Sequence, residues 1–254
     1  MQATPIAPTS FRIPVGAPHA TVPPARSLSR SVTGRGIMRI GTWNVDARWD
    51  PRHQRLVSEQ ACDVWLLTEI PDKVVLPGFR RHTTQGHMAR GQFWAAIFAR
   101  DLTPLDEPDP ATAAATFGEV TLWSSVLPWP SCGCQWPWAG DRHDDRIRTA
   151  LDGLQARRPA GDLIWGGDWN HSLEERVLGS RVGRASLVEL LDAFGLQVPT
   201  AALPHQIAGA KSIDHIAVPA SWQIRSAERV HAEADGRRLS DHDAYVVEVD
   251  IPEL

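Results

Sequence analysis

The sequence predicts an α/β protein, in which buried strands alternate with amphipathic helices. The clearest strand signal is the apolar run LIW at residues 163–165, which two glycines follow. With 254 residues, 43% of them hydrophobic, the chain can bury a sizeable core in one large domain or two small ones. The clearest helix signal lies in residues 142–157, where apolar residues recur at helical spacing on one face: Ile147, Ala150, Leu151 and Leu154.

Composition argues against several classes of protein. The net charge of −4 gives no global basic field of the kind that attracts nucleic acid. No apolar run approaches the ~20 residues of a membrane span. Cys132 and Cys134 lack the spacing and the second ligand pair of a structural zinc site, whereas Cys62 suits the core. Three cysteines cannot form a paired disulfide framework and suit a reducing compartment, so we expect a cytoplasmic location.

Residues 1–37 differ from the rest of the chain. They are rich in Pro, Ser, Thr and Arg, and the first acidic residue of the sequence is Asp46. Their Arg-rich composition loosely resembles a transit peptide, but no continuous apolar segment marks a secretory signal. A disordered leader, or a start codon assigned too early, is the simpler interpretation, because Met38 directly precedes the first strand. We expect this segment to be unstructured and dispensable, and residues 38–254 to form the folded domain.

The first two expected strands each end in a polar side chain. Residues 38–46 alternate as a strand does, and Asn44 and Asp46 share one face at its end. A short helix should follow over residues 51–60, because proline at its start suits the first turn. Residues 63–70 then carry four apolar side chains into Glu69, so a carboxylate again follows a buried strand.

Further elements follow in the middle of the chain. Residues 79–84 and 93–100 are expected to pair as a hairpin, residues 101–115 to form a loop, and residues 118–127 to form a strand. Three tryptophans then lie in the Pro-rich segment 128–138. Such tryptophans can roof over the core or stack on bases.

Residues 162–170, DLIWGGDWN, are the most informative stretch. Gly166 and Gly167 lack side chains at the expected strand end, so the backbone can bend or approach a ligand closely. Asp168 and Asn170 then lie on the same side of an extended chain. An aspartate can accept a proton from water, and an asparagine can donate hydrogen bonds to developing negative charge. The alternative is an Asx turn that caps the next helix.

The last third of the chain predicts one helix, two strands and a buried charge pair. Leucines at helical spacing precede Gly195, which supplies a helix stop. The strand over residues 212–218 contains Asp214, which is costly to bury without a partner. His242 precedes the last strand, residues 245–251, and a carboxylate beside an imidazole fixes the tautomer of the ring and supports its charged form.

Five short motifs occur in the order and spacing of a known family: TWNVD, LLTE, GGDWN, SIDHI and SDHD. Over residues 38–251 the chain resembles the endonuclease/exonuclease/phosphatase superfamily, which includes abasic-site endonucleases, deoxyribonucleases, sphingomyelinases and inositol-polyphosphate phosphatases. The resemblance implies a four-layer sandwich of two mixed β-sheets flanked by helices. It also implies a divalent-metal phosphoesterase site at one edge of that sandwich.

The resemblance further implies a role for each polar residue of the motifs. Glu69 would be the principal ligand of a hard cation, Mg²⁺ or alternatively Mn²⁺. Three further residues would lie around the same metal: Asn44, Asp46 and Asp241.

Four more positions would carry the chemistry. Asp168 would orient and deprotonate the attacking water, and Asn170 would hold a phosphate oxygen. Asp214 would support His242, which would bind the phosphate and stabilise the transition state.

Two positions depart from the family pattern. Val126 stands where a His, Tyr or Asn is usual, so one phosphate contact is missing unless Ser124 or Ser125 serves instead. Thr68 replaces the usual Gln before the metal-binding Glu, which is a milder change.

Three functional interpretations follow. The family, together with arginine clusters at 80–81, 142–148, 157–158 and 176–184, favours a nuclease acting on DNA, although the clusters are scattered along the sequence. A phosphatase or phosphodiesterase for a small molecule or a lipid headgroup is the alternative. A catalytically impaired binding module is the third, and the retained acidic and amide positions argue against it. We expect a monomer without a membrane span, whose partner is a phosphate-ester substrate.

Overall fold

A computed structural model describes residues 36–133, 137–174 and 178–252. Six strands form the first sheet: β1 (Gly36–Asn44), β2 (Val64–Ile70), β3 (Arg80–Thr83), β4 (Phe93–Ala99), β11 (Gln223–Val230) and β14 (Ala244–Ile251). Six form the second: β5 (Thr103–Pro104), β6 (Thr112–Phe117), β7 (Val120–Val126), β8 (Leu163–Asp168), β9 (Leu196–Gln197) and β10 (Asp214–Pro219). The described helices are α1 (Pro51–Glu59), α2 (His143–Ala156) and α3 (Arg181–Phe194), and β12 (Glu233–Ala234) pairs with β13 (Arg237–Arg238).

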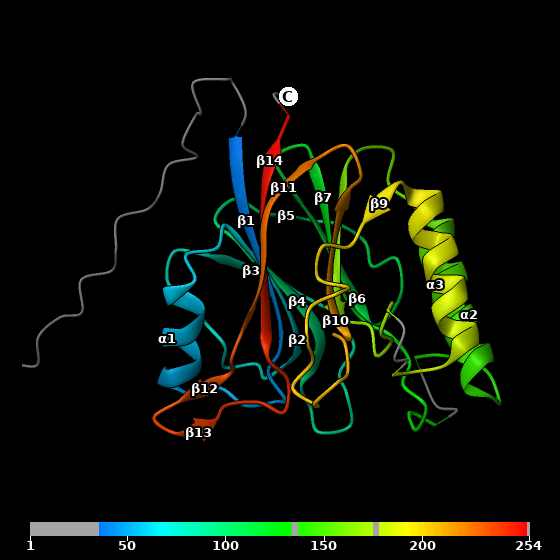
Figure 1. Ribbon diagram of the computed structural model, residues 1–254, viewed down its shortest axis with the longest axis horizontal. Helices are drawn as coiled ribbons and strands as arrows, with labels where there is room; N and C mark the ends of the chain where they lie inside the picture. The colour runs from blue at the N-terminus through cyan, green and yellow to red at the C-terminus, as the bar shows by residue number, and fades with distance from the viewer. Residues whose placement is uncertain (1–35, 134–136, 175–177, 253–254) are drawn as a thin grey trace, which may run out of the picture.

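The two large sheets lie against each other and are flanked by helices, α1 on one side and α2 with α3 on the other (Figure 1). Strand order is β11-β14-β1-β2-β4-β3 in the first sheet and β5-β6-β7-β8-β10-β9 in the second. Both sheets are mixed, because β1 pairs parallel with β2 and β7 parallel with β8 among antiparallel neighbours. The expected four-layer sandwich is therefore confirmed. None of the helices in the described ranges is long and apolar enough to cross a membrane.

Strand alternation assigns each apolar side chain to one of three core layers. The layer between the sheets contains Ile40 and Leu66 from the first sheet and Ile164 and Ile216 from the second. On the opposite face of β1 and β2, Trp43 and Leu67 pack beneath α1 with the helix residues Leu56 and Val57. The chain therefore buries both faces of each central strand, which explains why these strands are apolar almost throughout.

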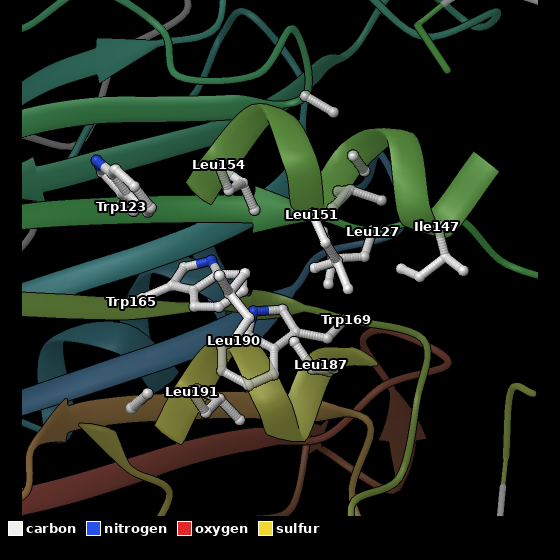
Figure 2. Packing of buried hydrophobic residues seen from close by; sticks show 14 of the residues in the cluster. Trp123, Leu127, Ile147, Leu151, Leu154, Trp165, Trp169, Leu187, Leu190 and Leu191 are labelled. Carbon is white, nitrogen blue, oxygen red and sulfur yellow. The ribbon is translucent and has the colours of Figure 1, made fainter. Parts of the chain in front are cut away.

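The third layer joins the second sheet to α2 and α3. Figure 2 shows Trp123 and Trp165 of the sheet facing leucines of both helices, including Leu154 and Leu190. Trp138 from the Pro-rich segment is 2% exposed and belongs to the same layer, so the interpretation that this residue roofs the core is confirmed. Trp129 is partly buried against this layer, whereas residues 134–136, which include Cys134, lie outside the described part of the chain.

Helix boundaries follow local sequence signals. Pro51 begins α1, and the Asp50 side chain accepts hydrogen bonds from the backbone of the first turn. The Ser180 side chain caps α3, and Gly195 ends it with a φ of 68°, a left-handed conformation that favours glycine. The expected helices over residues 51–60 and 142–157 and the stop at Gly195 are therefore confirmed.

One expectation about strands was wrong, and one strand was not predicted. The expected loop over residues 101–115 contains β5 and the start of β6, because Ala113 and Ala115 pack between the sheets despite the surrounding prolines. β11 had not been expected. It is an edge strand of exposed and half-buried residues, so its sequence lacks the apolar run that marks a central strand.

The double glycine of β8 serves close packing between strands. Gly167 has a φ of 129°, and a Cβ atom there would lie 2.1 Å from the Ser125 carbonyl oxygen. At Gly166 a Cβ atom would lie 2.7 Å from Cδ1 of Leu66. The expected close approach therefore exists, but Gly167 makes it to the neighbouring strand β7 and Gly166 makes it to β2 of the facing sheet.

Gly167→Ala is expected to destabilise the fold strongly, because the added methyl group meets backbone and the φ is strained. We expect the free energy of unfolding to fall by more than about 2 kcal/mol in denaturant titrations. The control is Gly78→Ala, which has a φ of 82° but no neighbouring atom within 4 Å and should cost only about 1 kcal/mol. Equal losses in the two variants would contradict a packing role for Gly167.

Candidate active site

The polar ends of four strands converge at one edge of the sandwich. Asn44 ends β1, beside Thr68 of the parallel strand β2, and Glu69 follows immediately. In the second sheet, Asp168 at the end of β8 lies directly opposite Asp214 at the start of β10. Side chains from both sheets therefore meet where the two layers end.

Asn44 connects the two sheets within this group. Its Nδ2 donates to Oε1 of Glu69 at 3.1 Å and to Oδ2 of Asp168 at 2.9 Å. Its Oδ1 accepts the backbone N–H of Asp46 at 2.9 Å. Asn44 is 1% exposed, so the amide is fixed and holds two carboxylates at a defined separation.

Glu69 and Asp46 form the more open end of the site. Both residues have a positive φ, 51° and 49°, and such backbone strain is concentrated at functional sites. Burial raises the pKa of the Glu69 carboxyl, and the Asn44 hydrogen bond opposes that effect. Arg90 places Nη2 at 2.9 Å from Oδ1 of Asp46 and 3.3 Å from Oε2 of Glu69, so a cationic group already lies between them.

His242 and Asp214 form the expected dyad. Nδ1 of His242 lies 2.7 Å from Oδ2 of Asp214. Burial alone would lower the pKa of His242, but the Asp214 and Asp168 carboxylates together raise it well above its ordinary value. Nε2 of the same ring lies 3.9 Å from Oδ2 of Asp168, so carboxylates face both nitrogens and favour the charged form of the ring.

Asp168 is a buried carboxylate whose two oxygens each accept a hydrogen bond. Besides Asn44, the backbone N–H of Asn170 donates to its Oδ1 at 3.0 Å. Burial raises the pKa of Asp168 to about 6, against the opposing effect of the charge on His242. A carboxylate with that pKa is deprotonated at neutral pH and is more basic than an ordinary aspartate, as a general base requires.

Asn170 does not extend the strand beside Asp168 as expected. Its φ is 55°, and its backbone bond to Asp168 closes an Asx-type turn. The turn does not cap the next helix, because Ser180 does so. Nδ2 of Asn170 donates to the Leu127 carbonyl at 3.0 Å, which orients the side chain and leaves its phosphate contact a prediction.

The two serines near Val126 make hydrogen bonds inside the fold. Ser124 donates to the Leu67 carbonyl at 3.2 Å. Ser125 lies 2.8 Å from both the Thr112 hydroxyl and Nε1 of Trp165. Both serines are fully buried, so neither can replace the polar residue that the family pattern places at Val126.

Three of the four predicted metal ligands open onto one cleft of about 710 Å³. Asp46, Glu69 and Asp241 line it together with Arg90 and an apolar wall that includes Trp129. Oxygen donors of this kind suit a hard divalent cation, and the bound guanidinium shows that the carboxylate pair accommodates positive charge. The residues therefore fit the cation that the motifs imply. Asn44 contacts Glu69 through its amide nitrogen, which is a donor and cannot bind a cation, so in this structure it orients the Glu69 carboxylate.

A second group of metal-ligating atoms lies deeper. This group consists of three residues, His205, Asp214 and His242, and each contributes one atom that could bind a metal. The three atoms lie within 4.8 Å of one another. The 2.7 Å separation between His242 and Asp214 is a hydrogen-bond distance, which places a proton between those two atoms. We therefore attribute this group of atoms to the hydrogen-bonded dyad.

Sequence reasoning missed Arg90, His205 and the cluster that supports the dyad loop. In that cluster, Asp243 accepts hydrogen bonds from Arg229 and Arg238. No motif marks Arg90 or His205, because both lie on loops whose positions depend on tertiary packing. For Asp243 the sequence contains a weak indication of a role, because it is the last charged residue of the SDHD motif before an apolar strand.

Arg90→Ala is expected to strengthen Mg²⁺ binding, because the guanidinium competes for Asp46 and Glu69. Arg90 is 61% exposed, and exposed ion pairs contribute about 0.2–1 kcal/mol, so the Kd measured by calorimetry should fall up to about fivefold. Arg55→Ala, which removes another exposed arginine that is paired with Asp235, is the control and should leave the Kd unchanged. Weaker Mg²⁺ binding to the Arg90 variant would contradict this competition.

Comparisons with known proteins agree with this architecture. Residues 41–242 match the model of the Endonuclease/Exonuclease/phosphatase family. The fold is similar to a 3' phosphatase, NExo, from Neisseria, solved with a product DNA hairpin, with a TM-score of 0.62 and 20% identity over 84% of this chain and 100% of that one. No curated protein matched the sequence.

Two further solved structures are similar. An endonuclease/exonuclease/phosphatase from Beutenbergia cavernae has a TM-score of 0.58 and 14% identity over 85% of this chain and 72% of that chain. The endonuclease domain of TRAS1, a telomere-specific non-LTR retrotransposon, has a TM-score of 0.54 and 18% identity, covering 84% of this chain and 98% of that domain. At these identities the likeness shows the fold alone.

Proposed function

The chain belongs to the endonuclease/exonuclease/phosphatase family of hydrolases that act on phosphate esters, and from that premise we propose that it is a Mg²⁺-dependent nuclease cleaving a phosphodiester of DNA. One observation carries the proposal. The amide nitrogen of Asn44 donates hydrogen bonds both to Glu69, which lines the cleft, and to Asp168 of the second sheet. His242 lies beside Asp168. The residues proposed as cation ligand, general base and phosphate-binding imidazole are therefore adjacent.

The carboxylates of the cleft are proposed to hold the cation, with Glu69 as the principal ligand and Asp46 and Asp241 beside it. When bound, a divalent cation neutralises charge on the phosphate and on the leaving oxygen. Arg90, which pairs with two of these carboxylates, would then be free to turn towards the substrate phosphate.

Asp168 is proposed to take a proton from the attacking water. The water oxygen forms the new bond to phosphorus, the bond from phosphorus to the leaving oxygen breaks, and the proton remains on Asp168 until it passes to solvent. The Asn44 and Asn170 donors prevent the carboxylate from rotating, so one lone pair faces the reacting water. Such positioning is a large part of phosphoryl-transfer catalysis.

His242 is proposed to donate its Nε2–H to a nonbridging phosphate oxygen. Asp214 keeps the ring charged and oriented through Nδ1. A charged donor near the phosphate stabilises the additional negative charge of the transition state. Asn170 adds a second, neutral donor in this proposal.

DNA is favoured as the substrate by the room beside the metal ligands. The cleft of about 710 Å³ joins the acidic end to a wall containing Trp129 and Met88, which suits a phosphate flanked by a nucleoside. The Neisseria 3' phosphatase and the TRAS1 endonuclease domain, which share the fold, support the same choice.

A substrate panel tests the proposal. Duplex DNA with an abasic site, DNA with a 3' phosphate, single-stranded DNA, sphingomyelin and inositol phosphates are compared with Mg²⁺ and with EDTA. We expect kcat/KM to be at least 10-fold higher for a DNA phosphodiester than for the others, and EDTA to abolish turnover. A preference for a headgroup, inositol phosphate or 3' phosphate would reject the nuclease assignment, and no turnover of any substrate would reject the hydrolase mechanism.

A further inference from the structure

His205 lies on a loop between β9 and β10 that is tied to the rest of the fold. Pro204 and Lys211 form an isolated antiparallel bridge across this loop. The Tyr245 hydroxyl donates to the Pro204 carbonyl at 3.0 Å, and Nη1 of Arg229 donates to the His205 carbonyl at 3.1 Å. The backbone that carries the His205 ring is therefore fixed on both sides.

The environment of His205 selects one tautomer. The backbone N–H of Ile207 donates to Nδ1 of His205 at 3.1 Å, so Nδ1 carries no proton. Burial, with the charges on His242 and Arg229, lowers the pKa of His205 to about 4. The ring is therefore neutral at neutral pH, and its single proton is on Nε2.

In the described part of the chain, that Nε2–H and one oxygen of Asp214 both lack a hydrogen-bond partner. His205 is 6% exposed, and among the described residues neither its Nε2 nor Oδ1 of Asp214 has a hydrogen-bond partner. The other Asp214 oxygen is engaged by His242. A buried donor and a buried acceptor of this kind are costly unless they serve each other or a ligand.

The two unpartnered atoms belong to residues that are neighbours. Ligand atoms of His205, Asp214 and His242 lie within 4.8 Å of one another. The His205 ring also stands edge-on to the His242 ring, with centroids 6.2 Å apart and an interplanar angle of 84°. The unpartnered donor and the unpartnered acceptor therefore lie in the same small cluster of side chains.

We propose that His205 is a positioning residue that donates its Nε2–H to Oδ1 of Asp214 and thereby fixes the orientation of His242. With both oxygens bound, the Asp214 carboxylate cannot rotate about its Cβ–Cγ bond, and the edge-on contact limits tilting of the His242 ring. This inference rests on the proposed function, because it takes His242 to be the phosphate donor.

Two substitutions separate the hydrogen bond from packing. His205→Phe keeps a planar ring against His242 but has no donor, whereas His205→Gln keeps an amide donor near the position of Nε2. Both lose the acceptor for the Ile207 N–H, so the difference between them reports on Nε2 alone. Thermal melting of the full-length variants checks that both fold.

We expect His205→Phe to lower the single-turnover rate by about 10–100-fold with little change in KM, as is typical when an orienting partner is lost. The proton NMR resonance of the His242 Nδ1–H should shift and broaden, because the carboxylate that holds it becomes mobile. His205→Gln should retain the wild-type resonance and a rate within about 3-fold of wild type.

Wild-type rate and resonance in the phenylalanine variant would overturn the proposal, as would equal defects in both variants. The resonance is measured without substrate, so it tests the hydrogen bond even if the wild-type protein hydrolyses no phosphodiester. An active wild type with an unaffected phenylalanine variant would reject the role of His205 and leave the proposed function intact.

Discussion

Replacing Asp168 by asparagine is expected to lower the single-turnover rate of phosphodiester hydrolysis by ~10²–10⁴-fold. The variant keeps the size of the side chain and one of its two acceptors, but it cannot take a proton from water. Substrate affinity should survive or increase, because a negative charge near the phosphate is removed. Rapid-quench hydrolysis and equilibrium binding at a fixed Mg²⁺ concentration measure the two quantities separately.

The stability of the Asp168 variant should depend on pH in a defined direction. The pKa of Asp168 in the folded state, about 6, lies above the ordinary value of 3.8. The protonated carboxyl therefore stabilises the wild-type fold fully below pH 3.8, and this stabilisation is lost as pH rises through 6. The melting temperature of Asp168→Asn relative to wild type should therefore increase between pH 4 and pH 8. The activity loss at pH 8 then cannot be attributed to unfolding.

Asp152→Asn is the matched control, because this aspartate is exposed on α2. It should leave both the rate and the pH trend unchanged. An Asp168→Asn enzyme with a near-normal single-turnover rate would remove the general base from the mechanism. A flat stability difference across pH would contradict the raised pKa.

Glu69→Gln is expected to abolish Mg²⁺-dependent turnover. Glutamine keeps the shape of the side chain but removes the charge that holds a hard cation. Loss of an outer partner of a metal site typically costs 10–100-fold, so loss of the principal ligand should exceed ~10²-fold in kcat/KM. Calorimetric titration with Mg²⁺ should show weaker binding in the variant.

Without metal, the same variant should melt at or above the wild-type temperature at neutral pH. Burial raises the pKa of Glu69, so its charge destabilises the fold above the ordinary carboxyl range, and that effect disappears at lower pH. Added Mg²⁺ should raise the melting temperature of wild type and of the exposed-residue control Glu189→Gln, but not of Glu69→Gln. Normal turnover and Mg²⁺ binding by Glu69→Gln would reject Glu69 as the ligand.

The sequence by itself determined the type of most elements and the polar residues that end them. Apolar runs marked β2, β8 and β14 because these strands are buried on both faces, and helical spacing marked α2 because only one face is buried. Motif order identified Asn44, Glu69, Asp168, Asp214 and His242, which the structure brings together. Their roles in chemistry stay predictions.

Only the tertiary structure decided features that depend on contacts between distant segments. The small residues of β6 form a strand because β7 pairs with them, and Ser124 and Ser125 are unavailable to substrate because neighbouring strands engage them. Arg90 and His205 reach the site from loops with no local pattern. The local sequence around a residue indicates its preference for helix or strand. The side chains that it contacts depend instead on how strands from two sheets come into register.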